Sequence, residues 1–166
     1  MSRIIVCDTG PLLHLSEADA IHLLRPAGNI LISPAISTEF KQNAPKRKLP
    51  SWVKIRQLDQ SARDRISEWI AKGIVDSGEA EAIGLVLQVK CDWFLTDDAK
   101  ARQFAESLGL EAHGSVGLLL WAVVMGHIES RAQAHQLLNG LIRSSLWISE
   151  RVIREAEKAI EELLPE

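Results

Sequence analysis

The sequence contains little of what several common classes of protein require. Its 166 residues include two cysteines, Cys7 and Cys91, which provide neither a disulfide framework nor a cysteine set for zinc. Lysine and arginine together number 19 against 22 aspartates and glutamates, and the net charge of −3 excludes a globally basic nucleic-acid coat. The longest apolar run without a charge, Gly114 to Gly126, is shorter than the about 20 residues that a membrane span needs. We therefore expect a cytoplasmic protein with reduced cysteines.

The apolar content suffices for one sizeable core. Hydrophobic residues make up 46% of the sequence and charged residues 25%, which is typical of a globular domain and not of a disordered chain. We therefore expect residues 1–166 to form one domain. Helical periodicity in the last part of the sequence predicts a helical C-terminal extension over about residues 128–166.

Short apolar segments alternate with segments of helical periodicity. The clearest strand candidates are Arg3–Cys7, Asn29–Ile32 and Trp93–Thr96, which are apolar without alternation, as strands covered on both faces are. Weaker strand candidates lie at 52–58 and 110–113. Helices are predicted at 12–18, 20–24, 34–41, 61–71, 76–90, 99–108, 115–125, 129–140 and 150–164. This order predicts an α/β fold with a central parallel sheet and helices on both faces.

Acidic residues follow the predicted strands or lie on the helices next to them. Asp8 comes directly after the first strand, and Glu39 lies on the helix after the second strand. Glu79 lies in the first turn of the helix before the third strand, which is itself followed by Asp97 and Asp98. Because the carboxyl ends of parallel strands lie at one edge of a sheet, we expect these side chains to converge there.

Helical phase separates two glutamates that are only two residues apart. Glu79, Ile83 and Leu87 fall on one line of their helix, so Glu79 extends the buried side of that helix at its N-terminus. Glu81 is turned about 200° away from Glu79 and is expected to face water.

Converging carboxylates repel one another unless their pKa values rise or a cation offsets their charge. Oxygen ligands without a histidine or cysteine set indicate one or two Mg²⁺ or Mn²⁺ ions. Such ions lower the pKa of a water and stabilise an attacked phosphate, which predicts phosphodiester chemistry.

Helix capping is a second interpretation of some of these acids. Asp76 and Glu79 have the spacing of a capping box, and one of Asp97 and Asp98 is expected to cap the next helix.

A basic segment, Lys41–Arg56, begins beside the acidic residues and contains six lysines and arginines but no aspartate or glutamate. We expect Lys41, Lys46, Arg47 and Lys48 to bind a phosphate backbone next to the acidic site, although a solvated loop can have the same composition. The histidines show no spacing that indicates a metal site or a catalytic base, and the tryptophans are scattered. Both residue types are therefore interpreted as structural.

The sequence resembles the PIN-domain nucleases, and most closely their VapC-like branch of predicted nucleic-acid-binding proteins. The matching stretches are IIVCDTGPLLHLSEA, SPAISTEF, VDSGEAEAIGLVLQ, FLTDDAKARQFAESLGL with GSVGLLL, and WISERVIREA, which span nearly the whole chain. The most specific parts are DTGPL, GEAEAI and TDDAKAR, because they occur together in this order and spacing.

The resemblance implies a three-layer α/β/α sandwich that cleaves RNA with Mg²⁺ or Mn²⁺. It also implies a toxin that is paired with an antitoxin protein and forms a dimer. Thr9 matches the hydroxyl residue that supports the first acid of the family. The residues that match the family's metal-binding and catalytic positions are Asp8, Glu39, Glu79, and Asp97 or Asp98. The choice between the last two stays open.

Two other functions fit parts of the pattern. A phosphatase that uses Asp8 as its nucleophile would need a second aspartate two residues later, where this sequence has Gly10. A non-catalytic PIN module that binds nucleic acid or protein would tolerate decay of the acidic site, whereas all the acidic positions are filled here.

Overall fold

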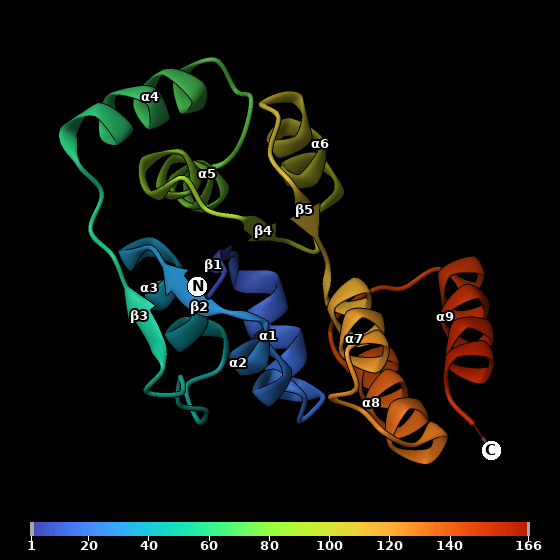
Figure 1. Ribbon diagram of the computed structural model, residues 1–166. Coiled ribbons are helices and arrows are strands. Elements are labelled where there is room, and N and C mark those ends of the chain that lie inside the picture. Colours follow the sequence, from blue (N-terminus) through green and yellow to red (C-terminus); the bar gives the residue numbers. More distant parts are fainter. Residues whose placement is uncertain (1, 166) are drawn as a thin grey trace.

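The computed structural model describes residues 2–165 and contains one sheet of five strands (Figure 1). The strands are β1 (Ile4–Cys7), β2 (Asn29–Ile32), β3 (Val53–Ile55), β4 (Trp93–Leu95) and β5 (Ala112–His113). Their order across the sheet is β3-β2-β1-β4-β5, and every neighbouring pair is parallel, as the sequence predicts. The carboxyl ends of all five strands therefore lie at one edge of the sheet.

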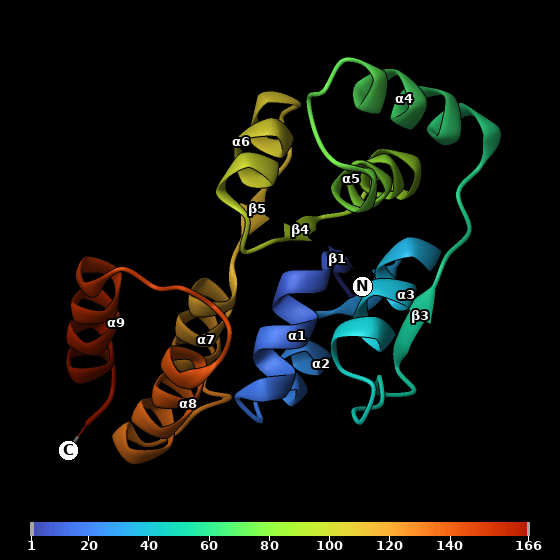
Figure 2. The same ribbon diagram turned by 180° about the vertical axis from the view of Figure 1, so that it is seen from behind.

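Helices cover both faces of this sheet. They are α1 (Thr9–Glu17), the 3₁₀ turn η1 (Ile21–Leu23), α2 (Leu24–Ala27), α3 (Pro34–Asn43), α4 (Gln60–Ala71), α5 (Ser77–Val89), α6 (Ala99–Ser107), α7 (Ser115–Val124), α8 (Arg131–Arg143) and α9 (Glu150–Leu163). The chain crosses the sheet in one direction from β1 to β3 and in the other from β3 to β5. Right-handed crossovers therefore place α1 and α3 on one face and α4, α5 and α6 on the other (Figures 1 and 2). The result is the predicted three-layer α/β/α sandwich.

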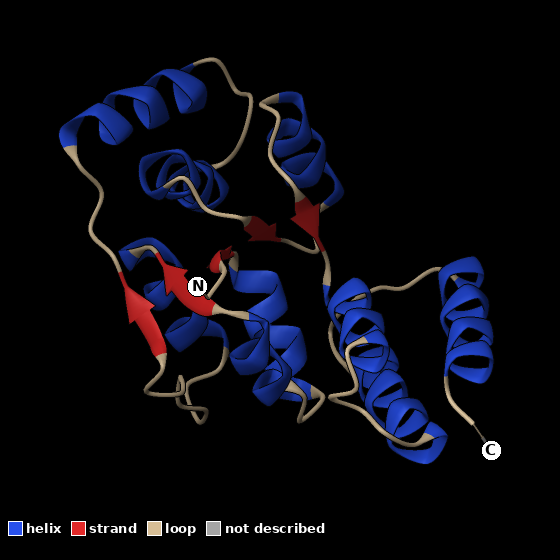
Figure 3. Cartoon of the chain, in the orientation of Figure 1, coloured by secondary structure: helices blue, strands red, loops and turns tan. Residues whose placement is uncertain are grey.

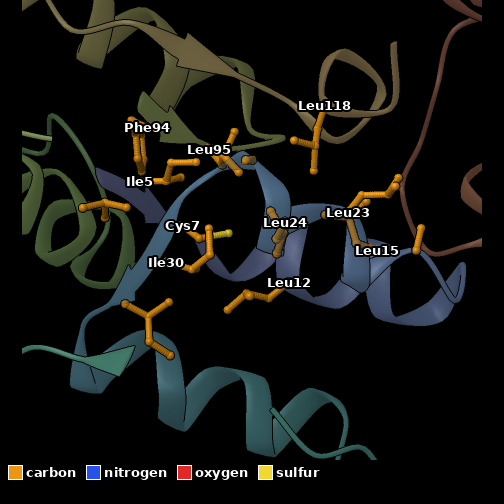
Figure 4. Packing of buried hydrophobic residues seen from close by; sticks show 14 of the residues in the cluster. Ile5, Cys7, Leu12, Leu15, Leu23, Leu24, Ile30, Phe94, Leu95 and Leu118 are labelled. Atoms are coloured by element: carbon orange, nitrogen blue, oxygen red, sulfur yellow. The ribbon is translucent and has the colours of Figure 1, made fainter. Parts of the chain in front are cut away.

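The strands are short (Figure 3), and β1 at the centre of the sheet is apolar throughout because helices cover both of its faces. Figure 4 shows Cys7 of β1, Ile30 of β2 and Leu12 of α1 packed in one cluster, and each of them is at most 1% exposed. Burial of one such aliphatic side chain contributes about 1.5–3 kcal/mol to stability. The weaker strand candidates in the sequence form strands that are shorter than expected, β3 and β5, which are the two outermost strands of the sheet.

The helices begin at residues that satisfy their free N–H groups. Ser33 caps α3, and its Oγ accepts a hydrogen bond from Ile36 N at 3.2 Å. The helix α1 begins at Thr9, three residues earlier than the sequence predicts, because Asp8 acts as its N-cap and proline is tolerated in a first turn.

The uncharged helix α7 is part of the core. It packs against α1, α8 and α9, and its residues Leu118, Leu119 and Ala122 are at most 1% exposed. Among residues 2–165, no helix has both the length and the apolar character needed to cross a bilayer. The description of residues 1–166 as one domain with a helical extension stays a prediction.

The junction between α2 and β2 has room only for glycine. A Cβ on Gly28 would collide with the carbonyl oxygen of Arg3, which also accepts a hydrogen bond from Asn29 N at 2.7 Å. Because the collision is with backbone, we expect Gly28→Ala to lower the free energy of unfolding by about 2 kcal/mol. Urea denaturation measures this change.

The matched control is Gly117→Ala on α7. A Cβ on Gly117 meets no other part of the described chain within 4 Å. Helix propensity predicts a gain of about 0.5–1 kcal/mol for this variant. Equal effects of the two substitutions would contradict the steric argument for Gly28.

Candidate active site at the carboxyl edge of the sheet

A pocket of about 530 Å³ lies at the carboxyl edge of the sheet, among α1, α3 and α5, which are far apart in the sequence but meet in space (Figures 1 and 2). The five acidic residues named from the sequence all line it: Asp8, Glu39, Glu79, Asp97 and Asp98. Asp76 and His14 line it as well. The structure therefore brings the predicted acidic residues together around one space.

Asp8 is held at both of its carboxylate oxygens. Its Oδ1 accepts a hydrogen bond from Thr9 N at 2.9 Å, and its Oδ2 accepts one from Thr96 Oγ1 at 3.0 Å. Its backbone N donates to Leu95 O at 2.8 Å, which ties the end of β1 to β4. The Asp8 carboxylate thus has a fixed position in the pocket wall.

Burial raises the pKa of Asp8 from 3.8 to about 6, because only 7% of the residue is exposed and the ionised carboxylate loses hydration. The hydrogen bonds from Thr9 and Thr96 lower this pKa, and the nearby carboxylates of Glu39 and Asp76 raise it. Desolvation is the largest of these effects. Ionisation of Asp8 at neutral pH therefore lowers the stability of the folded protein unless a cation offsets the charge.

Glu39 reaches the pocket from α3. Its Oε2 accepts a hydrogen bond from Thr9 Oγ1 at 2.5 Å, which links α3 to the first turn of α1. Gly78 at the start of α5 leaves room for this carboxylate, since a Cβ there would collide with Glu39 Oε1. Thr9 therefore contacts two of the acids, Asp8 through its backbone N–H and Glu39 through its hydroxyl.

Glu79 lies in the first turn of α5, three residues after the N-cap residue Asp76. Asp76 Oδ1 accepts a hydrogen bond from Glu79 N at 2.9 Å, as the capping interpretation predicts. Partial burial, together with the nearby carboxylates of Asp76, Asp98 and Asp8, raises the pKa of Glu79 from 4.5 to about 7. Capping and pocket lining therefore occur together in this segment.

The neighbours Asp97 and Asp98 have different partners. Asp98 is the N-cap of α6, and its Oδ2 accepts a hydrogen bond from Ala101 N at 2.7 Å. Asp97 accepts hydrogen bonds from Ser115 N at 2.7 Å and from Ser115 Oγ at 2.6 Å, and its Oδ2 lies 2.8 Å from His14 Nδ1. The predicted cap is thus Asp98. Both residues line the pocket, so the choice of metal ligand stays open.

The sequence does not point to a role at this site for His14 or Ser115, and it points to Asp76 only as a cap. The sequence favours a structural role for His14, yet His14 lines the pocket and contacts Asp97. Its position one helical turn after Gly10, which follows Asp8 closely, was an available signal. Ser115 had no signal in the sequence, because its contact with Asp97 depends on how the segments after β4 and β5 meet.

The expectation that Glu81 faces water is wrong. Its Oε1 accepts a hydrogen bond from Ala35 N, in the first turn of α3, at 2.9 Å. A carboxylate at a helix N-terminus stabilises the helix by about 0.3–1 kcal/mol. This contact holds α3, which carries Glu39, against α5, which carries Glu79.

The charge of the pocket fits a divalent cation. Six carboxylates line it, and no lysine or arginine of the described chain does so. Carboxylate oxygens are the ligands that Mg²⁺ and Mn²⁺ prefer. Among residues 2–165, no three His, Cys, Asp or Glu side chains stand in an arrangement that would hold an ion without moving. Metal binding would therefore require these carboxylates to move closer together.

The basic residues named from the sequence do not line the pocket, and the expected flap beside the acids is not formed by residues 46–48. The helix α3 runs away from the carboxyl edge, and the loop after it lies at the far end of α1 (Figure 1). There Arg47 Nη1 donates a hydrogen bond to Ser16 O at 2.7 Å. Nucleic-acid binding by Lys41, Lys46, Arg47 and Lys48 stays a prediction.

The three layers, the parallel sheet and the acidic pocket at its carboxyl edge are those of a PIN-like fold. A family model described as "DUF3368: PIN domain" matches residues 4–162, and the chain belongs to this PIN-domain family. PIN domains are generally nucleases, which are hydrolases that act on nucleic acids. No curated protein matches the sequence.

Replacement of Asp8 tests the electrostatic cost of the pocket. The pKa of Asp8 is about 6 in the folded protein, above the ordinary 3.8. The free energy of unfolding therefore decreases as the pH rises from about 3.8 to about 6, and it does not recover at higher pH. Asp8→Asn removes this charge and keeps an acceptor for Thr9 N. In the metal-free protein at about pH 7.5, we expect the variant to be more stable by about 3 kcal/mol.

Urea denaturation in EDTA measures this gain, and it should shrink to below about 1 kcal/mol near pH 4, where the Asp8 carboxyl is protonated in the folded protein. A difference between the two proteins that does not change with pH would contradict the electrostatic explanation.

Proposed function

We propose that this PIN-domain protein is a divalent-metal-dependent endoribonuclease that hydrolyses phosphodiester bonds in RNA. The observation that carries the proposal is the convergence of carboxylates on one pocket without a positive side chain to neutralise them. The choice of RNA as substrate is supported by the resemblance of DTGPL, GEAEAI and TDDAKAR to the VapC-like branch.

In this proposal, one or two Mg²⁺ or Mn²⁺ ions are held by Asp8, Glu39, Glu79, and Asp97 or Asp98. Bound ions would lower the pKa of a water and stabilise negative charge on the attacked phosphate. Asp8 provides oxygens in a fixed position, because Thr9 and Thr96 hold its carboxylate. Glu79, whose pKa is about 7, would lose its proton when an ion binds.

Thr9 and His14 would act as positioning residues. The Thr9 hydroxyl orients the Glu39 carboxylate, and the contact between His14 and Asp97 fixes both side chains in the pocket wall. These contacts reduce the movement needed to gather the ligands around an ion.

The biological role is part of the proposal and is supported by the same resemblance. We infer a VapC-like toxin of a toxin–antitoxin pair that acts in the cytoplasm as a dimer and is bound by an antitoxin protein. The two cysteines, Cys7 and Cys91, are both free in the structure, as a reducing compartment favours.

Cleavage of RNA should depend on the acidic pocket. The wild-type protein is expected to cleave single-stranded RNA in Mn²⁺ or Mg²⁺ and to be inactive in EDTA. Asp8→Asn and Glu79→Gln should each lower kcat/KM by about a hundredfold or more, because each removes an oxygen charge that holds the ion. Gel analysis of RNA fragments over time measures this loss.

The control for Glu79→Gln is Glu106→Gln, an exposed glutamate on α6 outside the pocket. Cleavage by the Asp8→Asn protein at the wild-type rate would falsify the proposal. If the wild-type protein neither cleaves RNA nor binds Mn²⁺, the chain is a non-catalytic PIN module that binds nucleic acid or protein.

Binding of Mn²⁺ should strengthen as the pH rises. The ion competes with protons for Asp8, whose pKa is about 6, and for Glu79, whose pKa is about 7. Between about pH 6 and pH 8, we therefore expect the affinity to increase about 10- to 20-fold in calorimetric titrations. Glu79→Gln should reduce this increase to about twofold. An affinity that is constant or falls over this range would contradict the assigned ligands.

A further inference from the structure

One face of the sheet is open over β2 and β3. The register pairs Leu31 of β2 with Lys54 of β3, so the two side chains lie on the same face. Strand alternation places Asn29 with Leu31, and Trp52 in the turn before β3 and Arg56 after it line the same pocket as Lys54. The opposite face carries the buried residues of both strands and packs on α1 and α3.

The same face is closed over β1. Val6, which pairs with Leu31, is 0% exposed, and α5 contacts β1 there. Leu31 is only half-buried, and Lys54 is exposed. In Figure 1, α3 lies behind β2 and β3, and no helix lies in front of them. The layer formed by α4, α5 and α6 therefore leaves this part of the sheet uncovered.

A pocket of about 570 Å³ lies on this open face. Its lining includes Trp52, Lys54, Arg56 and Asn29, and none of the described residues that line it is acidic. Within residues 2–165, neither Lys54 nor Arg56 forms an ion pair. The surface therefore presents positive charge, an aromatic ring and an amide together. We name it the β3 surface.

We propose that the β3 surface binds single-stranded RNA and leads it to the acidic pocket, an inference that rests on the proposed function. Lys54 and Arg56 bind phosphates, while Trp52 stacks on a base. Asn29 offers both a donor and an acceptor to a base edge. An acidic peptide would match the two positive charges but would leave the ring and the amide without a role, so the chemistry favours RNA.

The β3 surface runs along the strands, from Trp52 and Asn29 at their amino ends to Arg56 at the edge of the sheet where the acids lie. Arg56 N donates a hydrogen bond to Ile32 O at 2.9 Å, at the carboxyl end of β2. Ile32 is followed by Ser33 and by α3, which carries Glu39. Two strand spacings, about 10 Å, separate β3 from β1, which ends at Asp8. A strand of RNA that follows β3 thus arrives at the acids, whereas the loop at 46–48 lies at the other end of α3.

The test is binding of a labelled single-stranded RNA of about 10 nucleotides to the full chain, measured by fluorescence anisotropy in EDTA. EDTA prevents metal-dependent cleavage and so separates binding from catalysis. Three double variants each remove two positive charges: Lys54→Ala/Arg56→Ala on β3, Lys46→Ala/Lys48→Ala in the loop after α3, and Arg151→Ala/Lys158→Ala on α9. Far-UV circular dichroism checks that each variant is folded.

We expect Lys54→Ala/Arg56→Ala to raise the Kd about 20-fold at about 0.1 M salt. It should also reduce the slope of log K against log salt concentration by about 1.4, because each phosphate contact on a single strand contributes about 0.7. The α9 variant should bind as the wild type does. Trp52→Leu should weaken binding about fivefold or more without a change in the salt slope, and Trp52→Phe should restore most of it, since phenylalanine still stacks.

Equal losses in the β3 and α9 variants, or a larger loss in the loop variant, would overturn the inference. It would also be overturned if the wild type bound polyglutamate but not RNA, which would indicate an acidic protein partner.

Failure of this inference can be distinguished from failure of the nuclease proposal. If the protein binds RNA through the β3 surface but does not cleave it in Mn²⁺, the RNA-binding inference stands and the nuclease proposal fails. If the protein cleaves RNA but does not need Lys54 and Arg56 to bind it, the nuclease proposal stands and only the inference fails.

Discussion

Negative charge without a neutralising side chain, at the carboxyl edge of the sheet, is the constraint on which the rest of this site depends. Six carboxylates line one pocket there, and burial and mutual repulsion raise the pKa of Asp8 to about 6 and that of Glu79 to about 7. Hydrogen bonds from Thr9, Thr96 and Ser115 hold the carboxylates of Glu39, Asp8 and Asp97 in place around the pocket. Proteins retain such destabilising groups where function requires them.

The helices that carry the acids are joined to one another as well as to the sheet. Thr9 connects α1 to Glu39 on α3, and Glu81 on α5 binds the N-terminus of α3 at Ala35. Gly78 allows the closest approach, since any side chain there would displace the Glu39 carboxylate. The fold therefore fixes the relative positions of α1, α3 and α5 through contacts at the pocket itself, so that the adjustment needed to bind an ion falls on the carboxylate side chains.

The overall charge of the chain conceals a separation of opposite charges. The net charge is −3, yet the acidic pocket contains no lysine or arginine of the described chain, and the β3 surface contains no described acid. The β3 surface reaches the edge of the sheet where the acids lie only at its Arg56 end. A polyanion meets attraction on β3 and repulsion at the acids, so approach to the pocket would depend on a bound cation.

The sequence by itself determined the α/β class, the strands β1, β2 and β4 to within one residue, and the meeting of Asp8, Glu39 and Glu79. These follow from local hydrophobic patterns and from the rule that parallel strands end at one edge. Only the tertiary structure decided that His14 enters the pocket, that Glu81 caps a neighbouring helix, and that the loop at 46–48 lies far from the acids. It also decided which face of β3 stays open. Local periodicity does not encode these features, because each depends on where helices from distant parts of the chain pack against the sheet.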